Sequence, residues 1–454
     1  MTLDWLFKQY IEKSPVTVMI RATLENAFSP ESINRIFANA AKRQYQGELL
    51  FSSIVDLMAM VVWRQKKSVS EAYKDAKDKF EVSIRSVYNK LNGTETQVCR
   101  ALVHDSADRF CKTVDFLSTR KPLLKGYRTW IVDGNHLTST EHRLEVTRRT
   151  RSGPLPGQTL AVLDADRMLF VDLFCCEDGE AQERRMFSEL IPTTAPGQLW
   201  ISDRNFCTTG FVFGLARQGA CFLIRRHKST LVWEKQTGLK KIGRCATGMV
   251  YARIVSLQQG DDVLDVRMIT IKLDKPTESG DTEVELLTNL PKRDAGDARV
   301  AMLYLNRWTI ENAFQELEQS LRSEINTLGY PGAALLGFAV AVITYNALSI
   351  VKWAIEAEHK DEIRREDLSG YYMASSVAAD YGGMLIVLPP EKWTARFADL
   401  TPKELARELR ACAKNVRPDR YRKNVRGPKR PRPKRTSGRI AHHVSTAGLL
   451  EQKK

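Results

Sequence analysis

The chain has 454 residues, of which 43% are apolar and 27% are charged, and its formal net charge is +15. These fractions are those of a soluble globular protein, and the length allows two to four domains, so a chain without a packed core is excluded. The positive charge suits a polyanionic partner, although many basic proteins are merely soluble.

The eight cysteines include no C-x-x-C pair, and the histidines form no cluster with metal-ligand spacing. This pattern predicts reduced, mostly buried thiols in a cytosolic protein. The N-terminus carries an acid at position 4 and has no basic flank leading into an apolar segment. No secretory signal is therefore predicted, and the cytoplasm is the favoured location.

Residues 1 to 122 are predicted to form a helical DNA-binding region. Ser68 and Ser83 have the spacing of N-caps that start two consecutive short helices, which suggests a helix-turn-helix. An ordinary helical hairpin with a solvated basic face fits the same spacing. In the helix-turn-helix, the second helix would offer three side chains to a DNA major groove: Arg85, Asn89 and Lys90.

Residues 123 to 226 change to β-rich patterns in the order strand, hairpin, helix, strand, helix, strand. Two of the strands are short apolar runs that end in a carboxylate, Asp133 and Asp203. Open α/β sheets bind their ligands beyond such strand ends, so these two acids are candidate site residues. Asp172, inside the predicted hairpin, is the rival for Asp203.

Residues 227 to 296 contain three alternating or β-rich runs, at 249 to 257, 263 to 273 and 282 to 290, separated by turn residues. One helix and one strand would not need so long a connection. The segment is therefore predicted to be an inserted antiparallel β-subdomain.

Residues 297 to 360 are predicted to hold two helices. In the first, at 304 to 322, an apolar stripe lies beside a polar stripe. The polar stripe consists of Tyr304, Arg307, Glu311, Gln315, Glu318 and Arg322. The second helix includes 19 uncharged residues at 333 to 351, which is long enough to cross a bilayer. Four polar residues in its second half favour a buried core helix instead.

Residues 361 to 416 are again predicted to be helical, and residues 417 to 454 form a basic tail. Eleven lysines and arginines lie between 417 and 439, and the prolines at 428, 431 and 433 preclude a helix there. An extended arm that follows DNA phosphates is predicted, with a solubilising tail as the alternative. Its candidate DNA contacts are Lys429, Arg430, Arg432, Lys434 and Arg435.

Two carboxylates from strand ends and a third from a helix edge provide hard oxygen ligands. Asp133, Asp203 and Glu311 are therefore predicted to hold two divalent cations, and Mg²⁺ or Mn²⁺ suits them better than zinc. Two-metal sites of this kind perform phosphoryl transfer.

The pattern Tyr304, Arg307, Glu311, preceded by Asp133 and Asp203, resembles the DDE insertion-sequence transposases, whose catalytic core is RNase H-like. It is most similar to the branch marked by a Tyr-Arg-Glu-Lys helix signature. Where that signature has lysine, this chain has Glu318, and a carboxylate does not replace a phosphate-contacting ammonium. Arg322, one turn further, is the candidate substitute.

The resemblance implies an α/β fold: an RNase H-like core with the inserted β-subdomain, flanked by helical N- and C-terminal regions. It also implies a transposase that binds double-stranded DNA at the element ends and the target, works as a homodimer, and is nucleoid-associated in the cytoplasm, with no membrane partner. Two Mg²⁺ or Mn²⁺ ions would serve cleavage and strand transfer, while Tyr304 and Arg307 hold the DNA backbone. The alternatives are a nuclease without strand transfer and an inactive, transposase-derived DNA-binding protein.

Overall fold

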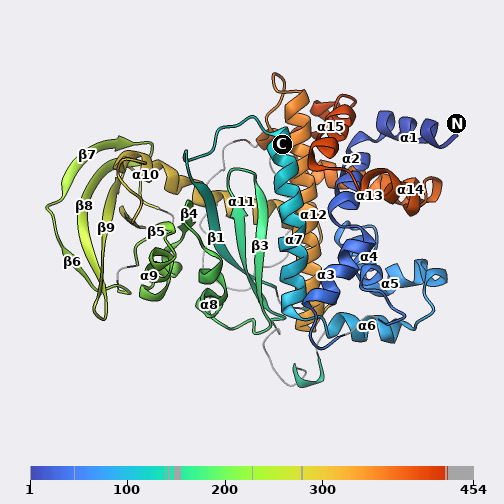
Figure 1. Cartoon of the computed structure of the whole chain (residues 1–454), viewed down its shortest axis with the longest axis horizontal. Helices are drawn as coiled ribbons and strands as arrows, with labels where there is room; N and C mark the ends of the chain where they lie inside the picture. The colour runs from blue at the N-terminus through green and yellow to red at the C-terminus, as the bar shows by residue number, and fades with distance from the viewer. Residues whose placement is uncertain are drawn as a thin grey trace, which may run out of the picture. The chain divides into compact units, whose positions relative to one another are not determined.

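A mixed β-sheet runs through the middle of the chain (Figure 1). Within the described residues it has ten strands in the order β3-β2-β1-β4-β5-β10-β9-β8-β6, with β7 paired to β8. The strands are β1 (Arg128–His136), β2 (Gln158–Asp164), β3 (Leu169–Cys176), β4 (Gln198–Ser202), β5 (Cys221–Arg225), β6 (Trp233–Lys235), β7 (Lys240–Cys245), β8 (Gly248–Gln259), β9 (Asp262–Leu273) and β10 (Glu283–Thr288).

The computed structural model describes residues 2–44, 47–138, 140–141, 144–147, 155–227, 229–277, 280–424 and 427. Met1–Arg422 form one compact unit, to which all the strands above belong, and Lys423–Lys454 form a second. Most of the predicted basic tail, including its five candidate DNA contacts, lies outside the described residues.

The first five strands form the RNase H-like core. β1 is antiparallel to β2 and parallel to β4, and β4 is parallel to β5. Because side chains alternate along a strand, β1 sends Ile131 to one buried cluster and Val132 to the other, on opposite faces of the sheet. The predicted strand order and fold class are confirmed, and so is the hairpin formed by β2 and β3.

The β-rich insertion continues this sheet, because β10 pairs antiparallel with β5 and then with β9. The three predicted strands of the insertion are present as β8, β9 and β10. β6 and β7 were not predicted. β7 pairs with β8 alone among the described strands, so it lies at the edge of the sheet. Its sequence, which contains Lys240, Lys241 and Arg244, lacks the apolar alternation of a buried strand and therefore gave no strand signal.

Helices precede the sheet, as predicted for the N-terminal region. They are α1 (Thr2–Lys13), α2 (Pro15–Ala27), α3 (Pro30–Ala40), α4 (Phe51–Val62), α5 (Val69–Asp75), α6 (Ile84–Asn92) and α7 (Thr96–Leu117), with the short 3-10 helix η1 (Lys77–Lys79). Ser68 and Ser83 are N-caps, accepting hydrogen bonds from the backbone N–H groups of Glu71 and Ser86. Both predicted caps are confirmed.

Short helices connect the core strands, and longer ones follow the insertion. The connecting elements are η2 (Glu145–Thr147), η3 (Glu183–Met186), α8 (Phe187–Leu190), η4 (Ile191–Thr193), η5 (Arg204–Phe206) and α9 (Thr209–Arg217). The later elements are α10 (Asp297–Tyr304), η6 (Leu305–Arg307), α11 (Trp308–Ser320), α12 (Pro331–Glu358), η7 (Arg365–Asp367), α13 (Gly370–Val387), α14 (Pro390–Phe397), α15 (Pro402–Ala413) and η8 (Pro418–Tyr421). The helical C-terminal region is thus as predicted.

α12 is the helix with the 19 uncharged residues, and residues 332 to 356 within it are all buried. By length and composition it is the one described helix able to cross a membrane, but its apolar stretch is wholly enclosed by protein. It lies beside α7 against β3 (Figure 1). The predicted buried core helix is confirmed.

Polar residues of α12 form hydrogen bonds with backbone groups in and beside β3, the strand at one edge of the sheet. Asn346 accepts a hydrogen bond from Phe170 N at 2.8 Å and donates one to Phe170 O at 2.7 Å. Ser349 and Trp353 donate to the carbonyls of Met168 and Arg167. The helix therefore supplies the partners that a neighbouring strand would otherwise give to β3.

We expect Asn346→Leu to lower the free energy of unfolding by about 2 to 4 kcal/mol, because both polar backbone groups of Phe170 would be buried without a partner. Urea denaturation measures this change. Asn415→Leu, at an exposed position, is the control and should have little effect. Equal losses in the two variants would show that the edge of β3 does not depend on Asn346.

Candidate active site

Asp133 and Asp203 lie at the same edge of the sheet. β1 and β4 run parallel with Ile131 opposite Ile201, so each aspartate follows two residues after a paired isoleucine. β1 continues to His136 against β2, whereas β4 stops at Ser202. The prediction that Asp133 ends its strand is therefore wrong. Asp133 lies within β1, two residues after the last position at which β1 pairs with β4.

Asp203 follows β4 directly and caps η5, accepting a hydrogen bond from Asn205 N at 2.8 Å. Asp172, the rival candidate, is elsewhere. Its carboxylate is paired with Arg100 of α7 through two hydrogen bonds of 2.8 and 2.9 Å. The turn acids Asp164 and Asp166 also have structural partners in backbone N–H groups.

The predicted single helix at 304 to 322 is wrong in two respects. The helix is interrupted by the 3-10 turn η6, and it ends at Ser320. Arg322 therefore does not lie on the helix face with Glu311. Its backbone N–H bonds to Val62 O, and its guanidinium donates to the carbonyls of Lys66 and Lys67.

Glu311 lies in the first turn of α11, which packs against β1. The neighbouring Ile310 is fully buried, so the helix is fixed with the Glu311 side chain 40% exposed. The predicted division of this helix into an apolar side and a polar edge therefore holds from Trp308 to Ser320.

Arg307 links the helix to the sheet. Its Nη1 lies 2.6 Å from Glu311 Oε1 and 3.9 Å from Asp133 Oδ2. Trp308 lies beneath the same guanidinium, with its ring centroid 4.6 Å from Arg307 Cζ, and is 55% exposed. The Arg307 guanidinium thus lies between the carboxylates of Asp133 and Glu311.

Negative charge is concentrated around Asp133. Burial and the nearby charge of Asp203 together raise the pKa of Asp133 to about 7, against the opposing charge of Arg307. Burial also raises the pKa of Tyr304, which is 7% exposed, and the charge of Asp203 contributes. The electrostatics therefore couple residues from β1, the end of β4 and the helix that follows the insertion.

Glu183 is a residue of this site that sequence reasoning missed. Its carboxylate lies directly over Gly134, where an added Cβ would meet Glu183 Oε1 at 2.1 Å. Burial and the charge of Asp203 raise the pKa of Glu183. No local pattern marks it, because its approach to Asp133 depends on the absence of a side chain at Gly134.

A cleft lies beside Asp133 and Glu311. Its other lining residues include Asn135, Gln315, Glu318 and Glu324. Glu318, where the Tyr-Arg-Glu-Lys signature has lysine, is exposed on the same face of α11 as Glu311. A carboxylate thus lines this cleft at the position where an ammonium was expected.

The donor atoms suit a hard divalent cation, but the three carboxylates are not gathered around one point. Among the described residues no three His, Cys, Asp or Glu side chains are close enough together to hold a metal ion. Asp133 and Asp203 fit such an ion, because their like charges raise the pKa of Asp133 and a cation would relieve that repulsion. Glu311 could join them only after leaving Arg307.

The remaining candidate DNA contacts are on α6. Arg85 and Asn89 are exposed, as a groove-reading face requires. Lys90 is partly buried, with its Nζ 5.0 Å from the centroid of the Phe37 ring, and burial lowers its pKa.

Comparison with known proteins identifies the class of the core. Residues 126–346 match the family model described as "Transposase DDE domain", which covers just under half of the chain and includes Asp133, Asp203 and Glu311. The segment is therefore similar to transposase DDE domains. The match does not define the branch with the Tyr-Arg-Glu-Lys signature.

Among solved structures, the chain is similar to one described as "Cryo-EM structure of piggyBac transposase synaptic complex with hairpin DNA". The TM-score is 0.40 at 9% identity, over 93% of this chain and 88% of that chain. A search of curated proteins finds no match.

We expect Asp133→Asn to stabilise the metal-free protein by on the order of 2 kcal/mol at pH 8 and hardly at all at pH 4. The folded-state pKa of Asp133, about 7, exceeds its ordinary value of 3.8. The wild type therefore loses stability as the pH rises through this window, because the unfolded chain releases the Asp133 proton while the folded protein still holds it. Thermal unfolding across the pH range measures the effect.

The exposed Asp261, in the turn between β8 and β9, provides the control, since Asp261→Asn should change stability little at either pH. A gain for Asp133→Asn that does not vary with pH would contradict the charge repulsion described here.

Proposed function

We propose that the chain is the DNA transposase of an insertion sequence, which cleaves DNA at the element ends and joins them to a target. The observation that carries the proposal is the meeting of Asp133, Arg307 and Glu311 at one edge of the sheet, with Asp203 close enough for its charge to act on Asp133. All four lie inside the segment that matches the transposase DDE domain.

Asp133, Asp203 and Glu311 would hold two Mg²⁺ or Mn²⁺ ions. When bound, two such ions activate the attacking oxygen and stabilise the leaving oxygen of a phosphoryl transfer. In their absence Arg307 acts as the counter-ion of the site, because it contacts Glu311 and lies near Asp133.

Arg307 therefore has two roles in this proposal. Once Glu311 turns toward a cation, the guanidinium is released and can make a bidentate contact with a DNA phosphate. The exposed ring of Trp308, stacked on Arg307, offers a flat apolar surface beside that phosphate. Tyr304 is buried near Arg307, so in this proposal it helps to position Arg307 and does not contact the DNA.

DNA would be bound by further parts of the chain. Arg85 and Asn89 on α6 are exposed and have side chains suited to base edges in the major groove, with Lys90 beside them. The arginine- and lysine-rich tail would contact phosphates without reading sequence. Pairing two element ends calls for two copies of the chain, so the working form is proposed to be a homodimer.

We expect Asp133→Ala, Asp203→Ala and Glu311→Ala each to reduce metal-dependent cleavage of element-end DNA by at least about a thousandfold, while end binding changes little, because these residues hold metal rather than DNA. Gel assays of cleavage and of binding measure the two effects separately. Asp261→Ala is the control of equal charge change.

The same assays distinguish the alternatives. Cleavage without strand transfer between paired ends would indicate a nuclease on the same fold. Binding without cleavage by the wild type, in Mg²⁺ and in Mn²⁺, would indicate an inactive DNA-binding descendant. A single alanine variant with near-native cleavage would remove its residue from the site.

A second prediction concerns the effect of the charge at Glu318 on DNA affinity. Because its carboxylate lines the cleft beside Glu311, it repels a phosphate there. We expect Glu318→Lys to tighten binding of cleaved-end DNA by about fivefold to fiftyfold at low salt, with a smaller gain at high salt. Glu391→Lys, at an exposed position on α14, makes the same change of charge away from the cleft.

Fluorescence anisotropy at several salt concentrations measures both variants. Equal effects of Glu318→Lys and Glu391→Lys would mean that net charge alone is responsible, and that DNA does not approach α11 at this point.

A further inference from the structure

A pocket of about 210 Å³ lies in the helical part of the chain, outside the candidate active site. Its walls come from α2, α4, α12, α13 and α14, so N-terminal and C-terminal helices enclose it together. A cavity of about 150 Å³ accommodates a ring the size of benzene, so this one has room for a small organic molecule. None of the DNA-binding or metal-binding residues proposed above lines it.

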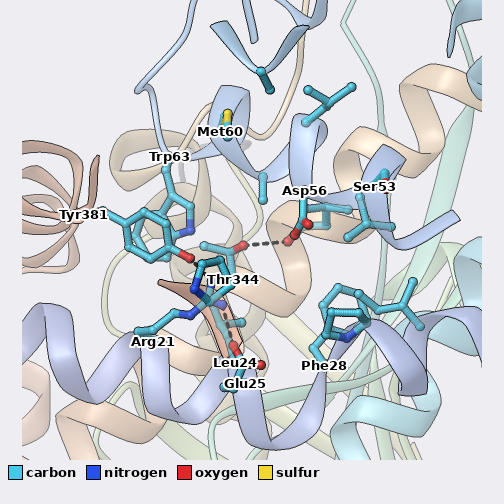
Figure 2. A pocket seen from close by; sticks show the side chains of 18 of the residues that line it. Arg21, Leu24, Glu25, Phe28, Ser53, Asp56, Met60, Trp63, Thr344 and Tyr381 are labelled. Carbon is cyan, nitrogen blue, oxygen red and sulfur yellow. Dashed lines mark hydrogen bonds and ion pairs between the residues drawn. The ribbon is translucent and has the colours of Figure 1, made fainter. Parts of the chain in front are cut away.

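One wall of the pocket is polar and tightly tied together. Arg21 of α2 forms a 2.5 Å ion pair with Glu25 and donates a hydrogen bond to the hydroxyl of Tyr381. Glu25 in turn accepts a hydrogen bond of 2.5 Å from Thr394 of α14. Figure 2 shows the side chains of Arg21 and Tyr381 meeting at this wall.

Asp56 of α4 also lines the pocket, and it does not take part in the ion pair between Arg21 and Glu25. It comes from the face of α4 that also presents Ser53 and Met60 to the pocket. Figure 2 shows its carboxylate turned toward Arg21 and Thr344. Its side chain remains exposed, because the space that it faces is not filled by protein.

The ionisable residues that line the pocket balance in charge, with Arg21 and Lys79 against Glu25 and Asp56. Arg21 forms its ion pair with Glu25, whereas Asp56 has no cation at ion-pair distance among the described residues; Lys79, at the exposed edge, acts on it only from a longer distance. Although Asp56 keeps contact with the solvent in the pocket, the protein packed around it raises its pKa to about 6, against the opposing charge of Arg21. A cation beside this carboxylate would favour its ionised form and would therefore be stabilising.

The other walls are apolar and aromatic. Phe28, Trp63 and Phe80 line the pocket together with Leu24 and Met60. Aromatic rings attract a cation through their faces and cover the hydrocarbon part of a ligand. The amide nitrogen of Gln65, which also lines the pocket, is buried without a hydrogen-bond partner among the described residues. A ligand with an acceptor oxygen would satisfy it.

We propose that this pocket binds a small organic ammonium ion, with the ammonium group paired to Asp56 and an apolar or aromatic body against Phe28, Trp63 and Met60. Such a ligand would contact α4 and the C-terminal end of α2. The site is independent of the proposed DNA chemistry, because none of its residues belongs to the candidate active site.

The test compares 2-phenylethylammonium with its uncharged analogue 2-phenylethanol on the full-length protein, by isothermal titration calorimetry and ligand-observed NMR. The ammonium ion should bind saturably and at least about tenfold more tightly than the alcohol, as a charge-assisted hydrogen bond implies. Asp56→Asn should remove this difference while the alcohol still binds. Asp108→Asn, which removes an exposed carboxylate from α7, should leave both affinities unchanged.

Ser53→Phe fills the pocket without changing its charge and should abolish binding of both compounds. Circular dichroism checks that each variant is folded. The proposal is overturned if the alcohol binds as tightly as the ammonium ion, if Asp56→Asn leaves their ratio unchanged, or if the wild type shows no saturable binding of 2-phenylethylammonium.

Discussion

A helix that is apolar on every face must be covered on every face, and the fold of this chain is arranged around that requirement. α12 is packed against α7, α2, α4, α6 and α15 and against strand β3. One cluster of buried side chains consequently extends from Phe7 to Tyr421 and joins the terminal helices to the RNase H-like core. The helical regions are thus structural partners of the RNase H-like core.

The helix that carries Glu311 is held by this same core. Glu316 of α11 forms an ion pair with Lys352 of α12, and Phe314 stacks on Phe170 of β3 with ring centroids 5.4 Å apart. At its C-terminus, Arg64 donates to the carbonyls of Glu318 and Leu321. The position of the Glu311 backbone relative to the sheet is therefore fixed by packing.

Patterns that depend on local burial were predictable from the sequence. The apolar runs before Asp133 and Asp203 identified two buried strands, and the capping serines at 68 and 83 identified helix starts. Features that depend on distant partners were not. The residues of η6 are ordinary helix formers, but α10 packs against the β-insertion while α11 packs against β1, so the two halves separate.

Arg322 illustrates the same limit. The helix ends before it because its backbone N–H is taken by Val62, which is 260 positions away in the chain. The contact between Glu183 and Gly134 likewise joins two elements whose proximity no periodicity reveals. The candidate acids were therefore found from the sequence, whereas their immediate surroundings required the fold.

The hydrogen bonds between Asn346 and Phe170 also have a consequence for synthesis. The two residues are 176 positions apart, so β3 leaves the ribosome well before the helix that covers its edge. At about 5 to 20 residues per second, that edge is open to pairing for roughly 10 to 35 seconds. During this time the edge can pair with another chain, which is the kind of association that chaperones suppress. A product truncated before α12 would keep a permanently open edge, so fragments of this protein should be removed by proteolysis rather than accumulate.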